Sequence, residues 1–176
     1  DLIVRGSKPV ALGLTRLEAV LDAVDGRLEA RVALEGKQLG RIAVLGTTTT
    51  GRGAARFTLP PDAALNASVK LNIPALNWVG PLAMAGLVTE GQLQSAITVS
   101  GSVAQRRFGG NIVASDVRVL LAEQGIDLRK GVLDSTFEGV RLLVRELRFE
   151  SGSGTLKASG PINLTSGLPE AQISLK

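Results

Sequence analysis

Apolar and polar residues alternate along much of the chain. Between residues 27 and 35 the even positions are apolar and the odd positions are mostly charged. Side chains of a β-strand point to opposite faces with a period of two, so this segment predicts a strand with one apolar and one polar face. The alternation returns in residues 68–73, 92–99 and 113–121. The face expected to be apolar in the last of these carries Val113, Val117, Val119 and Leu121.

Turn signals separate these segments at short intervals. Asp25-Gly26 predicts a tight hairpin, because Gly tolerates the positive φ angle that such a turn requires. Short strands with glycine-rich turns predict a meander of antiparallel strands. Further turns are expected at Gly36, Gly51, Gly101, Gly109, Gly110, Gly125, Gly131, Gly139, Gly152 and Gly154.

Two segments fit this scheme less simply. In residues 14–24, Leu14, Leu17 and Leu21 have the spacing of an amphipathic helix. The same segment also fits a strand with Leu17, Ala19, Leu21 and Ala23 on one side, and the strand is the favoured interpretation. Residues 74–82 are bounded by prolines and predict a single helical turn or a loop that packs Trp78 onto the apolar face.

The composition removes most catalytic chemistry. The chain has no Cys, His or Tyr. A thiol nucleophile, an imidazole base and a Cys/His zinc site are therefore excluded. Ser, Lys and carboxylates remain, but no pocket motif accompanies them. We expect no enzymatic activity, no cofactor and no metal.

The motifs that resemble catalytic or nucleotide sites are weak. Residues 51–56 begin like a dinucleotide fingerprint but lack its third glycine. Asp22 with Asp25, or Glu146 with Glu150, would be acid/base pairs only if a pocket held them together. Carboxylates on the polar face of strands are the favoured reading of all four.

The charge pattern does not favour nucleic acid as a partner. The net charge is +4, but the basic residues are spread along the predicted strands instead of forming a patch. The one basic and aromatic cluster is Arg106-Arg107-Phe108. It could contact lipid phosphates, although a turn with solubilising charges is the favoured interpretation.

A sheet with one apolar face must cover that face with something. Helical patterns are nearly absent, and the apolar residues are Leu, Val, Ala and Ile far more often than aromatics. We predict an all-β fold: a long, curved antiparallel meander sheet that forms an open, apolar-lined groove, with at most one or two short helical turns. A closed barrel or sandwich core is the alternative. The residues predicted to line the groove are Leu28, Ala30, Val32, Leu34, Ile42, Val44, Phe57, Leu59, Val69, Leu71, Ile73, Trp78, Leu93, Ile97, Val99, Val117, Val119 and Leu121.

The order and spacing of glycines and aliphatic residues over residues 65–165 resemble the TamB family of large periplasmic proteins, which are related to the AsmA-like group. The individual motifs are degenerate, and their succession carries the resemblance. They are residues 91–93, 99–101, 108–112, 125–128, 131–133, 139–142 and 151–160.

The resemblance implies a location and two alternative functions. Members are anchored in the inner membrane, reach through the periplasm, and work with TamA, an outer-membrane barrel of the Omp85 type. One implied function is a groove that carries or shields phospholipid acyl chains between the membranes. The other is a scaffold for assembling outer-membrane proteins and autotransporters. Contact with the TamA-like barrel is expected through other parts of the parent protein.

The chain is expected to be one domain, residues 1–176, of a longer protein, because its opening residues Asp1–Arg5 read as the middle of a sequence. No apolar run approaches the roughly 18 residues that span a bilayer. The lack of Cys suits the oxidising periplasm, as well as many cytosolic proteins.

Overall fold

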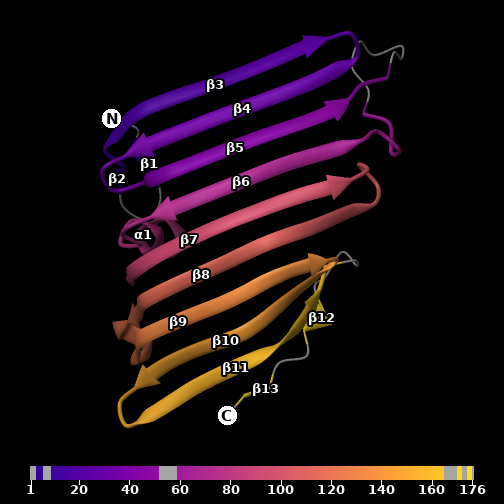
Figure 1. The fold of residues 1–176 in the computed structure, drawn as a ribbon. Coiled ribbons are helices and arrows are strands. Elements are labelled where there is room, and N and C mark those ends of the chain that lie inside the picture. The colour runs from indigo at the N-terminus through magenta and orange to yellow at the C-terminus, as the bar shows by residue number, and fades with distance from the viewer. Residues whose placement is uncertain (1–2, 6–8, 52–58, 165–169, 172–173, 176) are drawn as a thin grey trace.

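The computed structural model describes residues 3–5, 9–51, 59–164, 170–171 and 174–175. Nine consecutive strands form the body of one antiparallel sheet, in which every strand pairs with its neighbours in the sequence (Figure 1). They are β3 (Leu14–Val24), β4 (Arg27–Gly36), β5 (Gly40–Thr49), β6 (Leu65–Ile73), β7 (Leu87–Gly101), β8 (Arg106–Leu121), β9 (Ile126–Gly139), β10 (Arg141–Ser151) and β11 (Gly154–Asn163).

The remaining elements are short. β12 (Glu170–Ala171) and β13 (Ser174–Leu175) both pair with β11, and β1 (Ile3–Arg5) pairs with β2 (Pro9–Ala11) in a separate two-stranded sheet. The helical turns are α1 (Val79–Ala83) and η1 (Ala122–Gln124). This confirms the predicted fold class of an all-β meander.

The sheet is open. Its two ends are β3 and the β11 side, and among the described strands β3 pairs only with β4. Each strand packs mainly against its ladder neighbours, and α1 packs against β7. The alternative of a closed barrel or sandwich is therefore wrong for the described part of the chain.

The predicted hairpin at Asp25-Gly26 is confirmed. Asp25 has a φ of 49° and Gly26 a φ of 76°, the left-handed pair that a two-residue primed turn requires. The turn joins β3 to β4, so residues 14–24 are a strand. The helical alternative for this segment is wrong, because its residues pair with β4 in an antiparallel ladder that is unbroken from Arg16 to Val24.

Two of the predicted turns, at Gly109-Gly110 and at Gly131, are wrong. Gly109 and Gly110 lie inside β8, and Gly131 lies inside β9. A Cβ on Gly131 would lie 2.7 Å from Cδ1 of Phe149 and 2.8 Å from Cβ of Val117. Glycine at this position therefore makes room for side chains of the neighbouring strands instead of breaking the chain.

A β-bulge also overturns the predicted face of Val113. The β7–β8 register shifts between Glu90 and Gln92, and Asp116 adopts a φ of 54° there. The extra residue inverts the alternation, so Ala114 shares a face with Val117 and Val113 points to the other side. Val113 is accordingly exposed.

The segment between β6 and β7 forms the predicted helical turn. β6 ends at Ile73, opposite Leu93, so the first residues of β7 extend past it. α1 fills that space: Thr89 Oγ1 accepts a hydrogen bond from Gly80 N at 2.9 Å and donates one to the Leu76 carbonyl. Trp78 caps α1 and is half-buried.

The Gly131 contact generates a stability prediction. We expect Gly131→Ala to lower the free energy of unfolding by about 1–3 kcal/mol, because its methyl group overlaps the Phe149 ring. Gly46→Ala in β5 is the matched control, since its Cβ would meet only Ala67 Cβ, at 3.9 Å. Urea unfolding followed by circular dichroism measures both. Equal stability of the two variants would contradict the packing role assigned to Gly131.

Candidate functional site

The strand register gathers uncharged side chains on one face of the sheet, which we call the apolar face. It can be followed in rows of directly opposed residues that cross all nine strands. One row consists of Ala19, Val32, Val44, Val69, Ile97, Gly110, Phe137, Leu142 and Ile162. The next consists of Leu17, Leu34, Ile42, Leu71, Ser95, Ile112, Ser135, Val144 and Gly160.

Most of the predicted groove residues lie on this face. Those in the strands belong to it without exception, and apart from the buried Ile73 they are half-buried. They are Leu28, Ala30, Val32, Leu34, Ile42, Val44, Val69, Leu71, Ile73, Leu93, Ile97, Val99, Val117, Val119 and Leu121.

Two predicted groove residues are placed elsewhere, and a third is not described. Leu59 lies in the connection between β5 and β6, outside the strands, with 55% of its surface exposed. Trp78 belongs to the segment around α1, and its Nε1 is buried without a hydrogen-bond partner among the described residues. Phe57 lies outside the described residues.

The sequence pattern missed the part of the apolar face in β9, β10 and β11. Register shifts interrupt both the β8–β9 and the β9–β10 ladders, so strict alternation fails in this region. Residues such as Phe137, Leu147 and Phe149 were consequently not assigned. A positive φ at Lys130 marks one of these shifts, but the sequence around it gives no recognisable signal.

Two serines interrupt the apolar face without exposing an unsatisfied polar atom. Ser95 Oγ donates to the Asn111 carbonyl at 2.9 Å, and Ser135 Oγ donates to the Ile112 carbonyl at 3.2 Å. Both serines are buried. Because their hydroxyls bond within the sheet, they do not offer the polar contact that would select a ligand.

The apolar face is open to solvent to an unusual degree. A compact monomer of 18.3 kDa exposes about 8,100 Å², whereas this chain exposes 11365 Å². The total exceeds the area of a compact monomer by about 3,200 Å², and a larger area is the direction expected when a sheet lacks a second layer. The exposure is largest at the edge strand β3, where Leu17 is 63% and Leu21 69% exposed.

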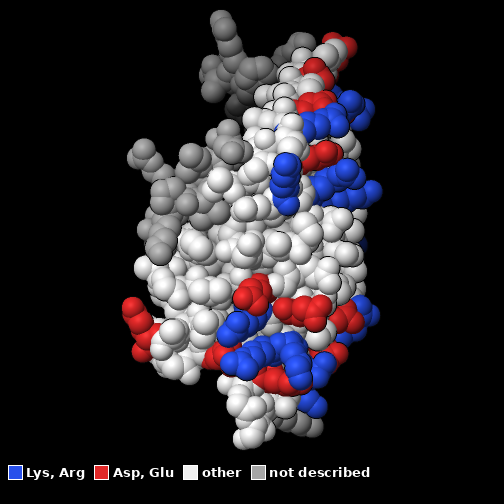
Figure 2. All heavy atoms as spheres, turned by 90° about the vertical axis from the view of Figure 1, so that its left-hand side faces the viewer, with Lys and Arg blue, Asp and Glu red and all other residues white. Residues whose placement is uncertain are grey.

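Charged side chains occupy the opposite, polar face. In Figure 2 they gather along one flank and in a band below the middle, and uncharged surface fills much of the rest. Most arginines there are paired within the sheet, so their charges are locally compensated. The pairs include Arg16–Glu18, Arg31–Glu29, Arg41–Glu35, Arg145–Asp134 and Arg148–Glu146.

Asp127 is the centre of the densest ion-pair network. Its carboxylate accepts from Arg129 Nε at 2.8 Å and from Arg118 Nε at 3.0 Å. These two guanidinium groups hold the pKa of Asp127 well below its usual range. Arg118 also lies 3.6 Å from Glu90. The network ties β7, β8 and β9 together and leaves the carboxylate no proton to exchange near neutral pH.

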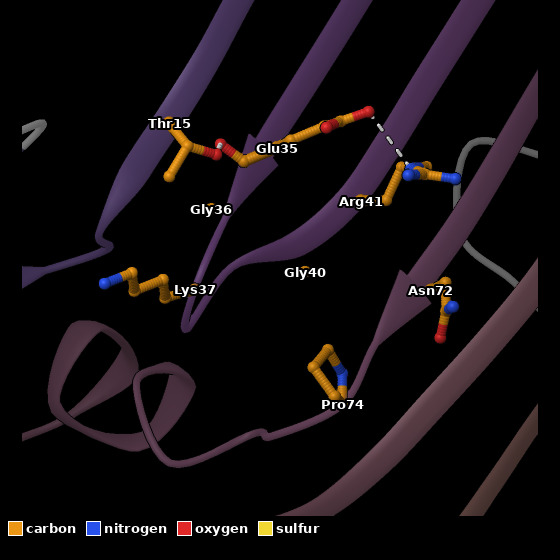
Figure 3. A pocket seen from close by; sticks show the side chains of 8 residues that line it. All are labelled: Thr15, Glu35, Gly36, Lys37, Gly40, Arg41, Asn72 and Pro74. Atoms are coloured by element: carbon orange, nitrogen blue, oxygen red, sulfur yellow. Dashed lines mark hydrogen bonds and ion pairs between the residues drawn. The ribbon is translucent and has the colours of Figure 1, made fainter.

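The cavity in Figure 3 lies where β4, β5 and β6 meet at one end of the sheet. It measures about 400 Å³. Arg41 Nε lies 3.1 Å from Glu35, Thr15 Oγ1 donates to the Glu35 carbonyl, and Lys37 points away from this pair. Thr15, Glu35 and Arg41 are thus engaged with one another, and among the described lining residues the Thr15 hydroxyl donates to a backbone carbonyl and not to a side-chain base.

The two carboxylate pairs considered from the sequence also have structural surroundings. Glu146 lies 3.2 Å from Arg148, and Glu150 lies 2.9 Å from Lys130. Asp25 forms part of the hairpin turn, and Asp22 is exposed on β3. In the described ranges, no group of three or more acidic, His or Cys side chains could hold a metal ion.

Comparison of the chain with models of protein families, with curated proteins and with solved structures gives no match. Among the described residues, no helix has the length and the apolar composition needed to cross a membrane. The apolar face is therefore interpreted from its own geometry.

The Asp127 network predicts a defined pH dependence. A carboxyl whose pKa is lowered by folding stabilises the protein above its unfolded pKa of about 3.9, and this contribution is lost as the pH falls below that value. We therefore expect Asp127→Asn to be less stable than the native chain at neutral pH, with the difference closing below about pH 4. Urea unfolding between neutral and acid pH measures it.

Asp22→Asn provides the control for this experiment. It removes the same charge from an exposed side chain that has no ion pair in the described part of the chain. We expect the free energy of unfolding of Asp22→Asn to fall with decreasing pH in the same way as that of the native chain. A constant difference between Asp127→Asn and the native chain at all pH values would contradict the assigned role of Asp127.

Proposed function

We propose that the chain is a non-enzymatic, periplasmic segment of a TamB-like protein, and that its apolar face carries or shields phospholipid acyl chains between the inner and outer membranes. The observation that supports this most is the apolar face, which crosses nine strands and carries a single charged residue of the ladder at its end, while α1 packs mainly against β7. Exposed apolar patches of soluble monomers rarely exceed a few hundred Å², and larger ones mark binding surfaces.

The chemistry of the face suits hydrocarbon. Each methylene of an acyl chain removed from water contributes about 0.8 kcal/mol, without any need for directed polar contacts. The lining is mostly aliphatic, and its aromatic pair, Phe108 and Phe137, has ring centroids 6.0 Å apart. Such a surface binds chains by area and not by shape, which suits cargo that has to move along it.

The edge strand β3 favours a second candidate, a scaffold for outer-membrane protein clients. β3 is 11 residues long and pairs with β4 on one side, and none of the described strands pairs with its other edge. A client strand could add to this edge through backbone hydrogen bonds. In that case a TamA-like barrel would be engaged through other parts of the parent protein.

Photo-crosslinking separates the two candidates. Val69 and Ile97 are directly opposed on the apolar face, and Ser68 and Thr98 are directly opposed on the polar face one residue away. We expect crosslinkers at Val69 and Ile97 to capture phospholipid in cells, and those at Ser68 and Thr98 to capture little. Polypeptide adducts at the first pair would favour the scaffold. Identical behaviour of both pairs would contradict a function for the apolar face.

A charge on the apolar face should block function without unfolding the sheet. In Val69→Asp the carboxylate can remain hydrated if the face is open, so we expect a loss of about 1–3 kcal/mol in stability together with loss of lipid capture. Ser68→Asp is the control on the polar face and should retain both its stability and its lipid capture. Circular dichroism measures the stability of each variant, and lipid extraction measures the captured lipid. Complete unfolding of Val69→Asp, or a folded variant that still captures lipid, would count against an open, lipid-binding face.

A further inference from the structure

We infer that Arg106 and Arg107 bind the phosphate of an amphiphile whose acyl chain lies on the apolar face. This inference rests on the proposed function and adds a place for the headgroup. The two arginines begin β8, at the turn that joins it to β7. The chemical class recognised is a phosphate ester attached to an aliphatic chain.

The register gives Arg106 a position that no other described charged residue of β3 to β11 shares. Arg106 is opposed to Gly101, and two residues further on Phe108 is opposed to Val99 on the apolar face. Because side chains alternate, Arg106 is on the same side as Phe108, at the end of that face. Among the described residues of β3 to β11, it is the only charged residue placed there by the ladder. Arg107 falls on the polar face beside it.

Neither arginine is neutralised by the sheet. The arginines in the middle of the polar face are held by carboxylates, as described above, but Arg106 and Arg107 are exposed and form no ion pair with the described residues. Glu138 on β9, opposite Gly109 and Arg141, likewise forms none. Their side chains leave the strand on opposite faces, but both arginines line the same cavity at the end of the strands, and two uncompensated guanidinium groups at one cavity are a site for an anion.

A cavity joins these arginines to the apolar face. It measures about 400 Å³, within the range of about 300–1,000 Å³ typical of small-molecule sites. Phe108 is opposed to Gly139 on β9, so no side chain occupies the cross-strand position beside its ring. The lining residues are Ala104, Gln105, Arg106, Arg107, Phe108, Val140 and Leu164.

The arrangement matches the two ends of an amphiphile. A phosphate ester offers negatively charged oxygens that a guanidinium fork binds through paired, charge-assisted hydrogen bonds. From Phe108 the ring contact with Phe137 leads onto the apolar face. The phosphate would therefore stay at the solvent-exposed strand ends while the acyl chain lies over the aliphatic rows. At the opposite strand ends, Arg41 is already paired with Glu35.

The test compares two amphiphiles with the same acyl chain, a monoacylglycerol phosphate and the uncharged monoacylglycerol, by their affinity for the whole chain. We expect the native protein to bind the phosphate form about tenfold more tightly. Arg106→Gln combined with Arg107→Gln should abolish this preference and leave binding of the uncharged form unchanged. That unchanged binding also shows that the variant is folded.

Arg27→Gln is the matched control. Arg27 is exposed, starts β4 at the same ends of the strands, and has no ion pair in the described part of the structure. It lies on the polar face, opposite Thr49. We expect Arg27→Gln to keep the full preference for the phosphate form. Loss of the preference in this variant would mean that net charge alone accounts for it, and would overturn the inference.

The remaining outcomes separate the headgroup site from the proposed function. Equal binding of both amphiphiles to the native chain overturns the phosphate site and leaves the acyl-binding face intact. If the native chain binds neither amphiphile, the acyl-binding face is overturned, and the inference with it. Inorganic phosphate alone is the third probe: if it perturbs the Arg106 and Arg107 side-chain resonances while neither amphiphile binds, the site takes free phosphate and the assignment to a lipid is wrong.

Discussion

The structure depends on the hydrogen bonds between neighbouring antiparallel strands. Few side chains in the described part are fully buried, and the apolar ones among them, such as Ile73, Ala114 and Val144, do not form a separate core. The sheet is therefore held by its backbone ladder and by pairs of side chains across it. In most domains of this size a second layer adds the larger share of stability. Within the described ranges no such layer covers the sheet, which leaves the apolar face available.

The two faces of the sheet have different roles. On the polar face, ion pairs such as Arg118–Asp127 and Arg145–Asp134 connect adjacent strands and keep the sheet hydrated. On the apolar face, the buried hydroxyls of Ser95 and Ser135 bond to carbonyls within the sheet. The β-bulges let the strands curve. The residues at two of them, Asp116 and Lys130, have positive φ angles and charged side chains, so the extra residue does not take an apolar side chain to the polar face. Lys130 is accordingly paired with Glu150.

Most of the fold could be predicted from the sequence, because alternation and turn chemistry act locally. The Asp25-Gly26 hairpin and the strand over residues 27–36 needed no tertiary information. The bulge at Asp116 was not predictable, since its cause lies in the pairing with β7, and it inverted the face of Val113. Gly131 looked like a turn because its partner, the Phe149 ring, comes from another strand. The apolar face could be predicted along β4 to β7 and at the end of β8, but not in β9 to β11, where register shifts interrupt the alternation.

The chain-order topology makes the molecule modular. Each strand contacts mainly the strands before and after it in the sequence. The stability of the sheet is therefore approximately a sum of contributions from pairs of neighbouring strands, as in solenoid proteins. A hairpin could be inserted or removed without re-threading the rest. Evolution can thus lengthen or shorten such a sheet in steps of about 10 Å per added pair of strands, so the span of the surface is set by counting hairpins.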